Sequence, residues 1–161
     1  MKAIKSIVLS ALIVLACASC KKKEEAVPSD TDYLVFGHFY GMCQGEQCVE
    51  IFKLETRNLW EDDNDHYPGQ QDFYQGHFLL LPSAKFEAVK DLADDFPAAL
   101  LNETERVIGL PDAGDWGGLY IEYSRNGTHR FWLLDQKKDN VPAYLHHFID
   151  RVNEKIALIN L

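Results

Sequence analysis

Alternating apolar and polar residues predict five β-strands after residue 31. The strands cover 33–40, 48–54, 73–81, 119–124 and 129–134, and each is rich in aromatic and β-branched residues. Asn126-Gly127 separates the last two strands and supplies the positive φ angles that a type I′ turn needs, so these strands are expected to form a hairpin. The first two strands are expected to pair as a second hairpin across the short loop 41–47.

Apolar residues at helical spacing predict two helices. The first follows Ser83, a suitable N-cap, and ends before Pro97. The second is the C-terminal segment, with Pro142 in its first turn. The segments 57–72 and 111–118 are predicted loops, and 98–110 fits no single element. Hairpins with two packed helices predict an α+β domain: an antiparallel sheet of about five strands with two main helices packed on it.

The first twenty residues have the pattern of a secretory signal. The positive segment 1–5 precedes the apolar stretch 6–16, and small residues follow. A helix needs roughly 20 apolar residues to cross a bilayer, so this stretch is too short for a membrane span. We therefore expect residues 1–19 to be cleaved as a signal peptide.

The end of this leader, Ala18-Ser19-Cys20, resembles the lipobox of bacterial lipoproteins, in which small residues precede a cysteine that is acylated and becomes the new N-terminus. The resemblance implies lipidation of Cys20. Cys17 is the alternative, but its use would leave Cys20 as an odd thiol in an oxidising compartment. In such lipoproteins an aspartate after the lipidated cysteine favours the inner membrane. Lys21 stands there, so the resemblance implies the outer membrane, with the leaflet left open.

Polar residues and a proline fill the segment after Cys20, which predicts an extended, hydrated linker. The expected organisation is therefore a lipoprotein signal peptide (1–19), a lipidated tether (20–31) and one globular domain (32–161). The chain beyond the leader resembles small envelope lipoproteins with a cysteine hairpin. That resemblance implies anchoring and no catalytic residue.

Composition and charge limit the kinds of partner that the domain can be expected to bind. Hydrophobic residues make up 47% of the chain and charged residues 25%, which is typical of a packed domain. The formal net charge is −9, and loss of Lys2 and Lys5 with the leader makes it −11. A surface this acidic repels phosphates, so we expect no nucleic-acid partner. Solubility alone or a cationic partner would fit the charge.

Cys43 and Cys48 lie at the two ends of a short predicted loop. Across a hairpin they can come within bridging distance, and outside the cytoplasm they are expected to oxidise. A redox dithiol normally has two intervening residues, whereas four lie between these cysteines. The alternative is a Cu(I) or Zn site that uses both thiolates with His38 and Met42.

The acidic run 61–65 lies between two aromatic residues, Trp60 and Tyr67. The run lacks the glycine and glutamate spacing of an EF-hand. Aromatic anchors beside charge are typical of protein interfaces, so the expected binding residues are the following: Trp60, Asp62, Asp63, Asp65 and Tyr67.

The chain contains no P-loop, no dinucleotide fingerprint and no H-E-x-x-H motif. We therefore predict a binding module rather than an enzyme, without a cofactor. The expected partner is a basic envelope protein, bound in the manner of an inhibitor or immunity protein. The alternative function is a metal-handling lipoprotein that uses the Cys43/Cys48 loop.

Overall fold

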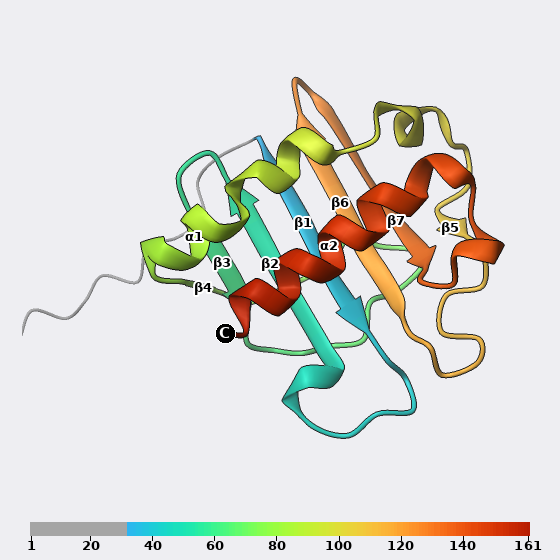
Figure 1. Cartoon of the computed structure of the whole chain (residues 1–161), viewed down its shortest axis with the longest axis horizontal. Coiled ribbons are helices and arrows are strands. Elements are labelled where there is room, and N and C mark those ends of the chain that lie inside the picture. Colours follow the sequence, from blue (N-terminus) through green and yellow to red (C-terminus); the bar gives the residue numbers. More distant parts are fainter. Residues whose placement is uncertain (1–31) are drawn as a thin grey trace, which may run out of the picture.

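The structure is a computed structural model that describes residues 32–161. The predicted signal peptide (1–19), the lipidation site Cys20 and the tether (20–31) lie outside the described residues. Figure 1 shows a single curved sheet with helices across it. Within residues 32–161, no helix is both long enough and apolar enough to span a membrane.

The sheet has seven strands in the order β4-β3-β2-β1-β6-β7-β5. Neighbouring strands are antiparallel, except that β5 runs parallel to β7. Along the chain the strands are β1 (Tyr33–Phe39), β2 (Val49–Glu55), β3 (Leu59–Asp62), β4 (Phe78–Leu80), β5 (Val107–Ile108), β6 (Gly118–Arg125) and β7 (Thr128–Asp135). The long central strands β1, β2, β6 and β7 therefore carry the short ones at the two edges.

Both predicted hairpins are confirmed. Phe39 pairs with Val49 at the closed end of the β1–β2 hairpin. Asn126 and Gly127 have φ angles of 52° and 79°, as the predicted type I′ turn between β6 and β7 requires. Each turn sets the register of its hairpin, and both hairpins meet where β1 pairs with β6.

The α+β class is confirmed, but the sheet has seven strands rather than about five. The predicted loop 57–72 contains strand β3. The sequence hid this strand because the acidic run that suggested a loop begins within it. Strand β5 has two residues, too few for a readable alternation. The predicted strand 73–81 is wrong in its first half, because within this segment only β4 (Phe78–Leu80) belongs to the sheet.

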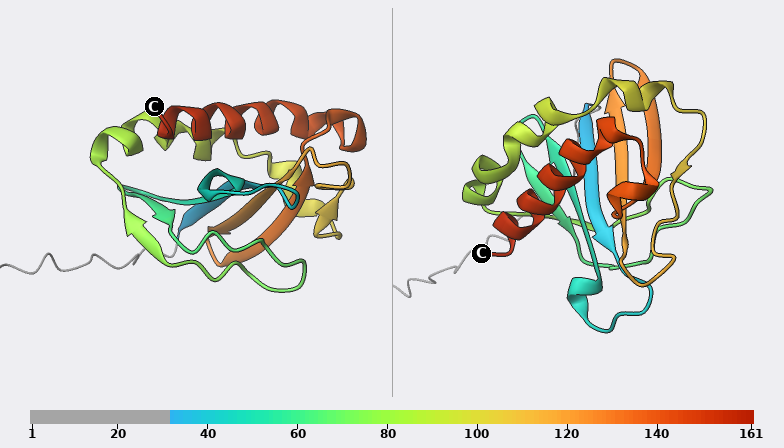
Figure 2. Two further views of the ribbon diagram at one scale, coloured as in Figure 1. Left: turned by 90° about the horizontal axis from the view of Figure 1, so that it is seen from below. Right: turned by 45° about the vertical axis from the view of Figure 1, so that its right-hand side comes forward.

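Helices cover one face of the sheet, as the two views in Figure 2 show. They are α1 (Ser83–Val89), α2 (His146–Ile159) and the 3₁₀ helices Lys90–Asp95, Ala98–Asn102, Lys138–Asn140 and Ala143–Leu145. A further 3₁₀ turn, Glu46–Cys48, precedes β2. Ser83 is the first residue of α1 and Pro82 takes the cap position, so the predicted side-chain cap at Ser83 is wrong. Buried Val152 and Ile156 of α2 belong to the main core with Trp132 of the sheet.

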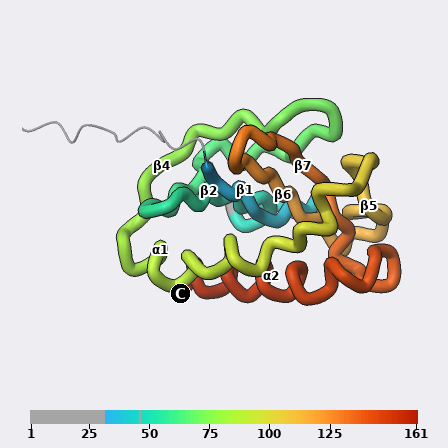
Figure 3. The backbone as a smooth tube through the Cα atoms, turned by 90° about the horizontal axis from the view of Figure 1, so that it is seen from above, coloured from blue at the N-terminus to red at the C-terminus, as the bar shows by residue number. Residues whose placement is uncertain are grey.

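The opposite face is covered by the long loop 63–77, which joins β3 to β4 and lies on the far side of the sheet from α1 and α2 (Figure 3). Phe73 and Tyr74 of this loop pack against buried Tyr120 and Phe131. The aromatic residues that suggested a strand at 73–77 thus cover the sheet instead of extending it. The sheet is therefore buried on both faces, by helices on one side and by a loop on the other.

Candidate partner-binding site

An acidic cavity of about 410 Å³ lies where β2, β3 and β4 come together. We call it the acidic cavity. Its lining contains no Lys or Arg from the described residues, and consists of Gln47, Glu50, Glu61, Asp62, Asp63, Asp65 and Leu79.

Strand pairing brings these residues together from three segments of the chain, 47–50, 61–65 and Leu79. Glu61 of β3 pairs with Phe52 of β2 on one side and with Leu79 of β4 on the other. Glu50 lies two residues before Phe52, on the same face of the sheet. Register, rather than closeness in sequence, therefore builds the cavity.

Glu50 joins the cavity to the end of α2. Its two carboxylate oxygens accept hydrogen bonds from the Asn160 side-chain amide at 2.9 and 3.0 Å, and its Oε2 lies 3.0 Å from His38 Nε2. Asn160 follows the last residue of α2, and at this helix end Lys85 Nζ donates to Ile159 O at 2.5 Å. The positive charge of Lys85 lies close enough to lower the pKa of Glu61.

The Glu61 carboxyl lies among like charges in the cavity. Burial raises the pKa of its carboxyl, and the neighbouring charges of Glu50 and Asp65 raise that pKa further, whereas Lys85 opposes them. Burial and the neighbouring like charges therefore outweigh the opposing effect of Lys85 on Glu61.

Asp62 has a different role from its neighbours, although it also touches the cavity. Its side chain is buried and accepts three hydrogen bonds, from Asp65 N at 3.1 Å, Tyr74 Oη at 2.6 Å and His77 N at 2.5 Å. These bonds fix both ends of the loop 63–77 on the sheet. Asp62 therefore lines the cavity with a carboxylate that donors of the fold already bind, and its role in binding a partner stays a prediction.

Asp63 and Asp65 come closer to the expected role. Asp63 is exposed and its Oδ1 lies 2.6 Å from His77 Nδ1. Asp65 is half-buried and has a φ of 50°, a left-handed conformation that aspartate tolerates in a tight turn. Both line the acidic cavity, as Glu61 does.

The two aromatic residues predicted as anchors are separated by the fold. Trp60 is only 1% exposed, and its indole N–H donates to Glu55 Oε2 at 2.9 Å. Trp60 is thus a core residue, and its predicted place on a binding surface is wrong. Tyr67 is 51% exposed, and its hydroxyl donates to Asp112 Oδ2 at 3.1 Å. Partial burial, followed by this hydrogen bond and the charge of Asp112, raises the pKa of Tyr67 to about 12.

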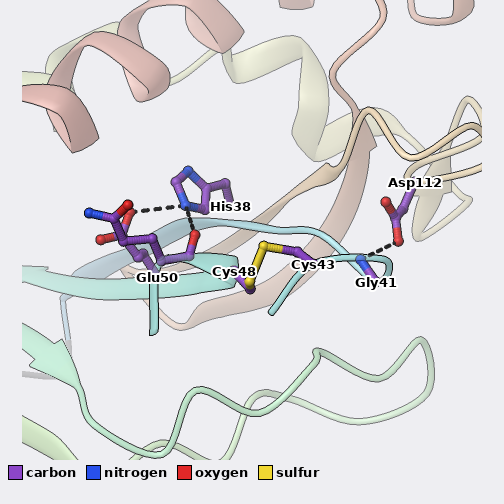
Figure 4. Close-up of a disulfide and its surroundings, with 7 residues drawn as sticks. His38, Gly41, Cys43, Cys48, Glu50 and Asp112 are labelled. Atoms are coloured by element: carbon purple, nitrogen blue, oxygen red, sulfur yellow. Dashed lines mark hydrogen bonds and ion pairs between the residues drawn. A yellow bond between two sulfur atoms is a disulfide. The ribbon is translucent and has the colours of Figure 1, made fainter. Parts of the chain in front are cut away.

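Tyr67 belongs to a cluster of loops next to the disulfide. Asp112 accepts hydrogen bonds from Gly41 N at 2.7 Å and Gly117 N at 3.2 Å, so it ties three loops together. Met42 in this cluster is 83% exposed. Figure 4 shows the bond between Gly41 and Asp112 beside the cysteine loop.

The predicted disulfide between Cys43 and Cys48 is present in the structure. The two Cα atoms are 5.5 Å apart, and Figure 4 shows the bridge between the ends of the loop. A metal site built on these thiolates would require the reduced pair. Within residues 32–161 there is no group of three or more His, Cys, Asp or Glu side chains that could hold a metal ion.

A second group of ionisable side chains lies under the loop 63–77. The buried carboxylate of Glu122 accepts hydrogen bonds from Tyr33 Oη at 2.8 Å and Tyr120 Oη at 2.6 Å, and its Oε1 lies 2.9 Å from His129 Nε2. Tyr74 N donates to Tyr120 Oη at 2.9 Å. This group therefore attaches the loop to the sheet, and the Glu122 carboxylate contacts Tyr33, Tyr120 and His129.

A cavity of about 390 Å³ lies between the α1 region and the other end of the sheet. Leu34, Phe86 and Phe96 are among its apolar lining residues. Two charged residues of its lining already have close partners: Lys90 Nζ is 2.6 Å from Glu87, and Asp91 is 2.6 Å from Lys155 Nζ. Its lining thus mixes signs, in contrast to the acidic cavity.

Sequence reasoning missed Glu50, Gln47 and Leu79 as parts of one site with the acidic run. The alternation of 48–54 placed Glu50 in a strand, but a lone polar residue there gives no sign of its neighbours. Only the pairing of β3 with β2 and β4, which the sequence did not reveal, brings these residues together.

No protein-family model matches the chain, and no curated protein matches it.

Proposed function

We propose that this chain is a lipid-anchored envelope protein whose domain binds a cationic protein at the acidic cavity, in the manner of an inhibitor or immunity protein. The observation that carries the proposal is the lining of the cavity, where five acidic residues stand without a Lys or Arg from the described chain. The proposed role is binding rather than catalysis, because charge capture needs neither a nucleophile nor a cofactor.

Electrostatics supports a cationic partner. The raised pKa of Glu61 reports repulsion from Glu50 and Asp65 as well as burial. A Lys or Arg side chain from a partner would relieve that repulsion, so binding would remove a cost that the free domain carries. A field of one sign focused in a cavity also raises association rates by about 10- to 1000-fold, most strongly at low salt.

The position of the cavity fits a domain held by its N-terminus. The described chain begins at one end of β1, whereas Glu50 pairs with His38 near the other end (Figure 1). At roughly 3.4 Å per residue, β1 spans about 20 Å. The acidic cavity would therefore lie near the opposite end of β1 from the attachment of a tether on Cys20.

Charge neutralisation tests the binding site. We would compare the mature protein with the triple variant Glu61→Gln, Asp63→Asn, Asp65→Asn in pull-downs from envelope extracts at low salt. The matched control is Asp94→Asn, Glu105→Gln, Asp139→Asn, which removes the same charge from exposed positions outside the cavity. The cavity variant should lose a basic partner by at least roughly tenfold, and the control should retain it.

Two results would contradict this proposal. If wild type captures no basic protein at low salt, the inhibitor or immunity role is wrong. If both triple variants lose the partner equally, the general charge of the domain binds it and the acidic cavity has no special part. Asp62 is left unchanged in both variants because it holds the loop 63–77 in place.

The anchor needs its own experiment. Cys20→Ser should leave an unprocessed, unlipidated precursor, whereas Cys17→Ser should be processed as in wild type. Mass spectrometry of the mature N-terminus distinguishes the two cysteines. Acyl groups on Cys17 would overturn the assignment, and fractionation of the two membranes would test the proposed outer-membrane location.

A further inference from the structure

Strand β4 is the outermost strand at its end of the sheet, and β3 is its one strand neighbour in the described part of the chain. Leu81 N donates to Leu59 O at 2.9 Å and Asp63 N donates to His77 O at 3.2 Å. Hydrogen-bonded pairs alternate along an antiparallel ladder, so Leu79 also faces β3. The backbone N–H and C=O groups of Phe78 and Leu80 therefore point away from the sheet.

The side chains of β4 also expose apolar surface at this edge. Leu79 and Leu80 are 40% and 49% exposed. Natural sheets commonly protect such an edge with short strands, charge, proline or a covering segment, because an open apolar edge invites another strand. On β4 the three residues are Phe, Leu and Leu, so the strand itself carries no charge.

The acidic cavity lies directly beside this edge. Leu79 lines the cavity, and its partner across the ladder is Glu61. A strand added to β4 would place its alternate side chains on the same face as Leu79, about 10 Å from the strand that carries Glu61. A long Lys or Arg side chain could cover most of that distance, while the side chains between would lie over Phe78 and Leu80.

We propose that β4 receives an extended basic segment of the partner as an added strand, with its Lys or Arg side chains directed into the acidic cavity. This inference rests on the proposed function and specifies how the cationic partner is recognised. Backbone hydrogen bonds to Phe78 and Leu80 would supply affinity, and the cavity would select a basic residue at alternate positions.

Charge argues against a second copy of this chain as the occupant. Pairing β4 with β4 would bring two acidic cavities next to each other. Each chain has a formal net charge of −9, and none of the residues that line the cavity is basic. A segment of alternating basic and apolar residues complements both the cavity and the exposed leucines.

The probe is an eight-residue peptide of alternating lysine and valine, titrated against the mature protein and followed by fluorescence anisotropy. Two matched peptides separate the contributions. One has N-methyl groups on alternate residues, which block strand addition, and the other has glutamate in place of lysine. The lysine–valine peptide should bind at least roughly tenfold more tightly than either of them.

Two protein variants address the same edge. Leu80→Pro removes the outward N–H, and proline is tolerated at an edge strand. Leu80→Ala keeps that N–H and is the matched control. Leu80→Pro should weaken peptide binding by at least roughly tenfold, while Leu80→Ala should change it by less than about threefold. Should Leu80→Pro fail to fold, the N-methylated peptide decides with wild-type protein.

The outcomes separate this inference from the proposed function. Equal binding of the N-methylated peptide, or no lysine–valine binding up to about 1 mM, overturns strand addition. If the cavity triple variant still loses the envelope partner while Leu80→Pro retains it, the acidic cavity binds but β4 does not take part. A wild-type dimer in light scattering that Leu80→Pro abolishes would identify a second copy as the occupant and overturn the inference.

Discussion

Two groups of carboxylates in this domain have opposite surroundings. Asp62, Glu122 and Asp135 are buried, and each accepts hydrogen bonds from several donors of the fold. Glu61 and Asp63, by contrast, are only partly buried or exposed, and they line the acidic cavity together with other carboxylates. The number of acidic residues in a segment therefore says little about their role. The donors that surround each carboxylate separate structural charge from charge available to a partner.

The same difference predicts opposite energetic effects of substitution. Removing a buried carboxylate leaves its donors without partners, at a cost of about 1–3 kcal/mol for each unsatisfied group. Removing a crowded carboxylate relieves repulsion and leaves no buried donor behind, because the His77 ring that contacts Asp63 is exposed to solvent. Substitutions in the first group should therefore destabilise the domain, and substitutions in the second should be neutral or stabilising.

The largest effect is expected at Asp135. Its carboxylate accepts hydrogen bonds from Leu110 N, Trp116 Nε1, Lys137 N and Asn140 Nδ2, at 2.9, 2.8, 2.8 and 2.7 Å. Asp135→Ala should lower the free energy of unfolding by about 3–5 kcal/mol, because four donors lose their acceptor in a buried site.

Urea unfolding followed by circular dichroism measures this loss. Asp139→Ala is the control, since Asp139 is exposed and lies four residues away. It should change the free energy of unfolding by about 0.5 kcal/mol or less. Equal losses in the two variants would show that hydrogen-bonded burial does not distinguish the carboxylates of this domain.

A sharper comparison uses two adjacent residues, Asp62 and Asp63. Asp62→Ala should cost about 2–3 kcal/mol, because Tyr74 Oη and His77 N lose a buried acceptor and the loop 63–77 loses its attachment. Asp63→Ala should stay within about 0.5 kcal/mol, since its one ion pair, with His77, is exposed. Urea midpoints of the two variants, measured under one buffer condition, make the test.

Proteolysis adds an independent readout for this pair. Loop detachment in Asp62→Ala should expose new cleavage sites between residues 63 and 77, and Asp63→Ala should keep the wild-type pattern. If Asp63→Ala proves the more sensitive of the two, the structural role assigned to Asp62 is wrong.

These adjacent residues also show how far the sequence alone could lead. The long strands and the hairpin at Asn126-Gly127 were predictable, because turn chemistry and alternation act locally. The acidic run 61–65 was visible as well. The sequence did not show which of Asp62 and Asp63 is buried. That depends on Tyr74 and on the backbone of His77, which a loop of 15 residues places next to Asp62.

The candidate site was predictable only in part for a related reason. The side chain of Trp60 lies on a strand too short to show alternation, and its burial depends on pairing with Lys53 and Leu80. Likewise, Glu50 joins Glu61 through the register of β2 and β3. Local sequence therefore predicts the strands and helices. The site depends on the pairing of the edge strands, which the residues of one strand do not reveal.

The disulfide lies next to the acidic cavity, where the carboxylates repel one another. It closes the loop that carries Gln47, a lining residue of the acidic cavity, just before β2. Replacing Cys43 and Cys48 together with serine should lower the free energy of unfolding by about 2 kcal/mol on the chain-entropy model. Urea unfolding of wild type with and without reductant should give the same difference.

Free-thiol counting provides the check on this pair. In protein taken from the cell envelope, neither Cys43 nor Cys48 should react before reduction. Two reactive thiols in the native protein, or a stoichiometric metal bound to them, would instead favour the metal-handling alternative.

The smallest effect has the opposite sign and concerns Glu61. Its pKa is raised above the ordinary value of 4.5, first by burial and then by Glu50 and Asp65, so the folded state holds the proton to higher pH than the unfolded state does. Between those two pKa values the free energy of unfolding therefore falls as the pH rises. Below 4.5 both states are protonated and the penalty is absent. Glu61→Gln should thus stabilise the domain at pH 7 by about 0.5 kcal/mol, a modest gain because solvent screens a half-buried group, and the gain should shrink toward pH 4. Urea midpoints at both pH values, with Glu105→Gln as the exposed control, measure it; a loss of stability at pH 7 would mean that Glu61 is held by favourable contacts like those of Asp62, and the contrast between the two groups would fail.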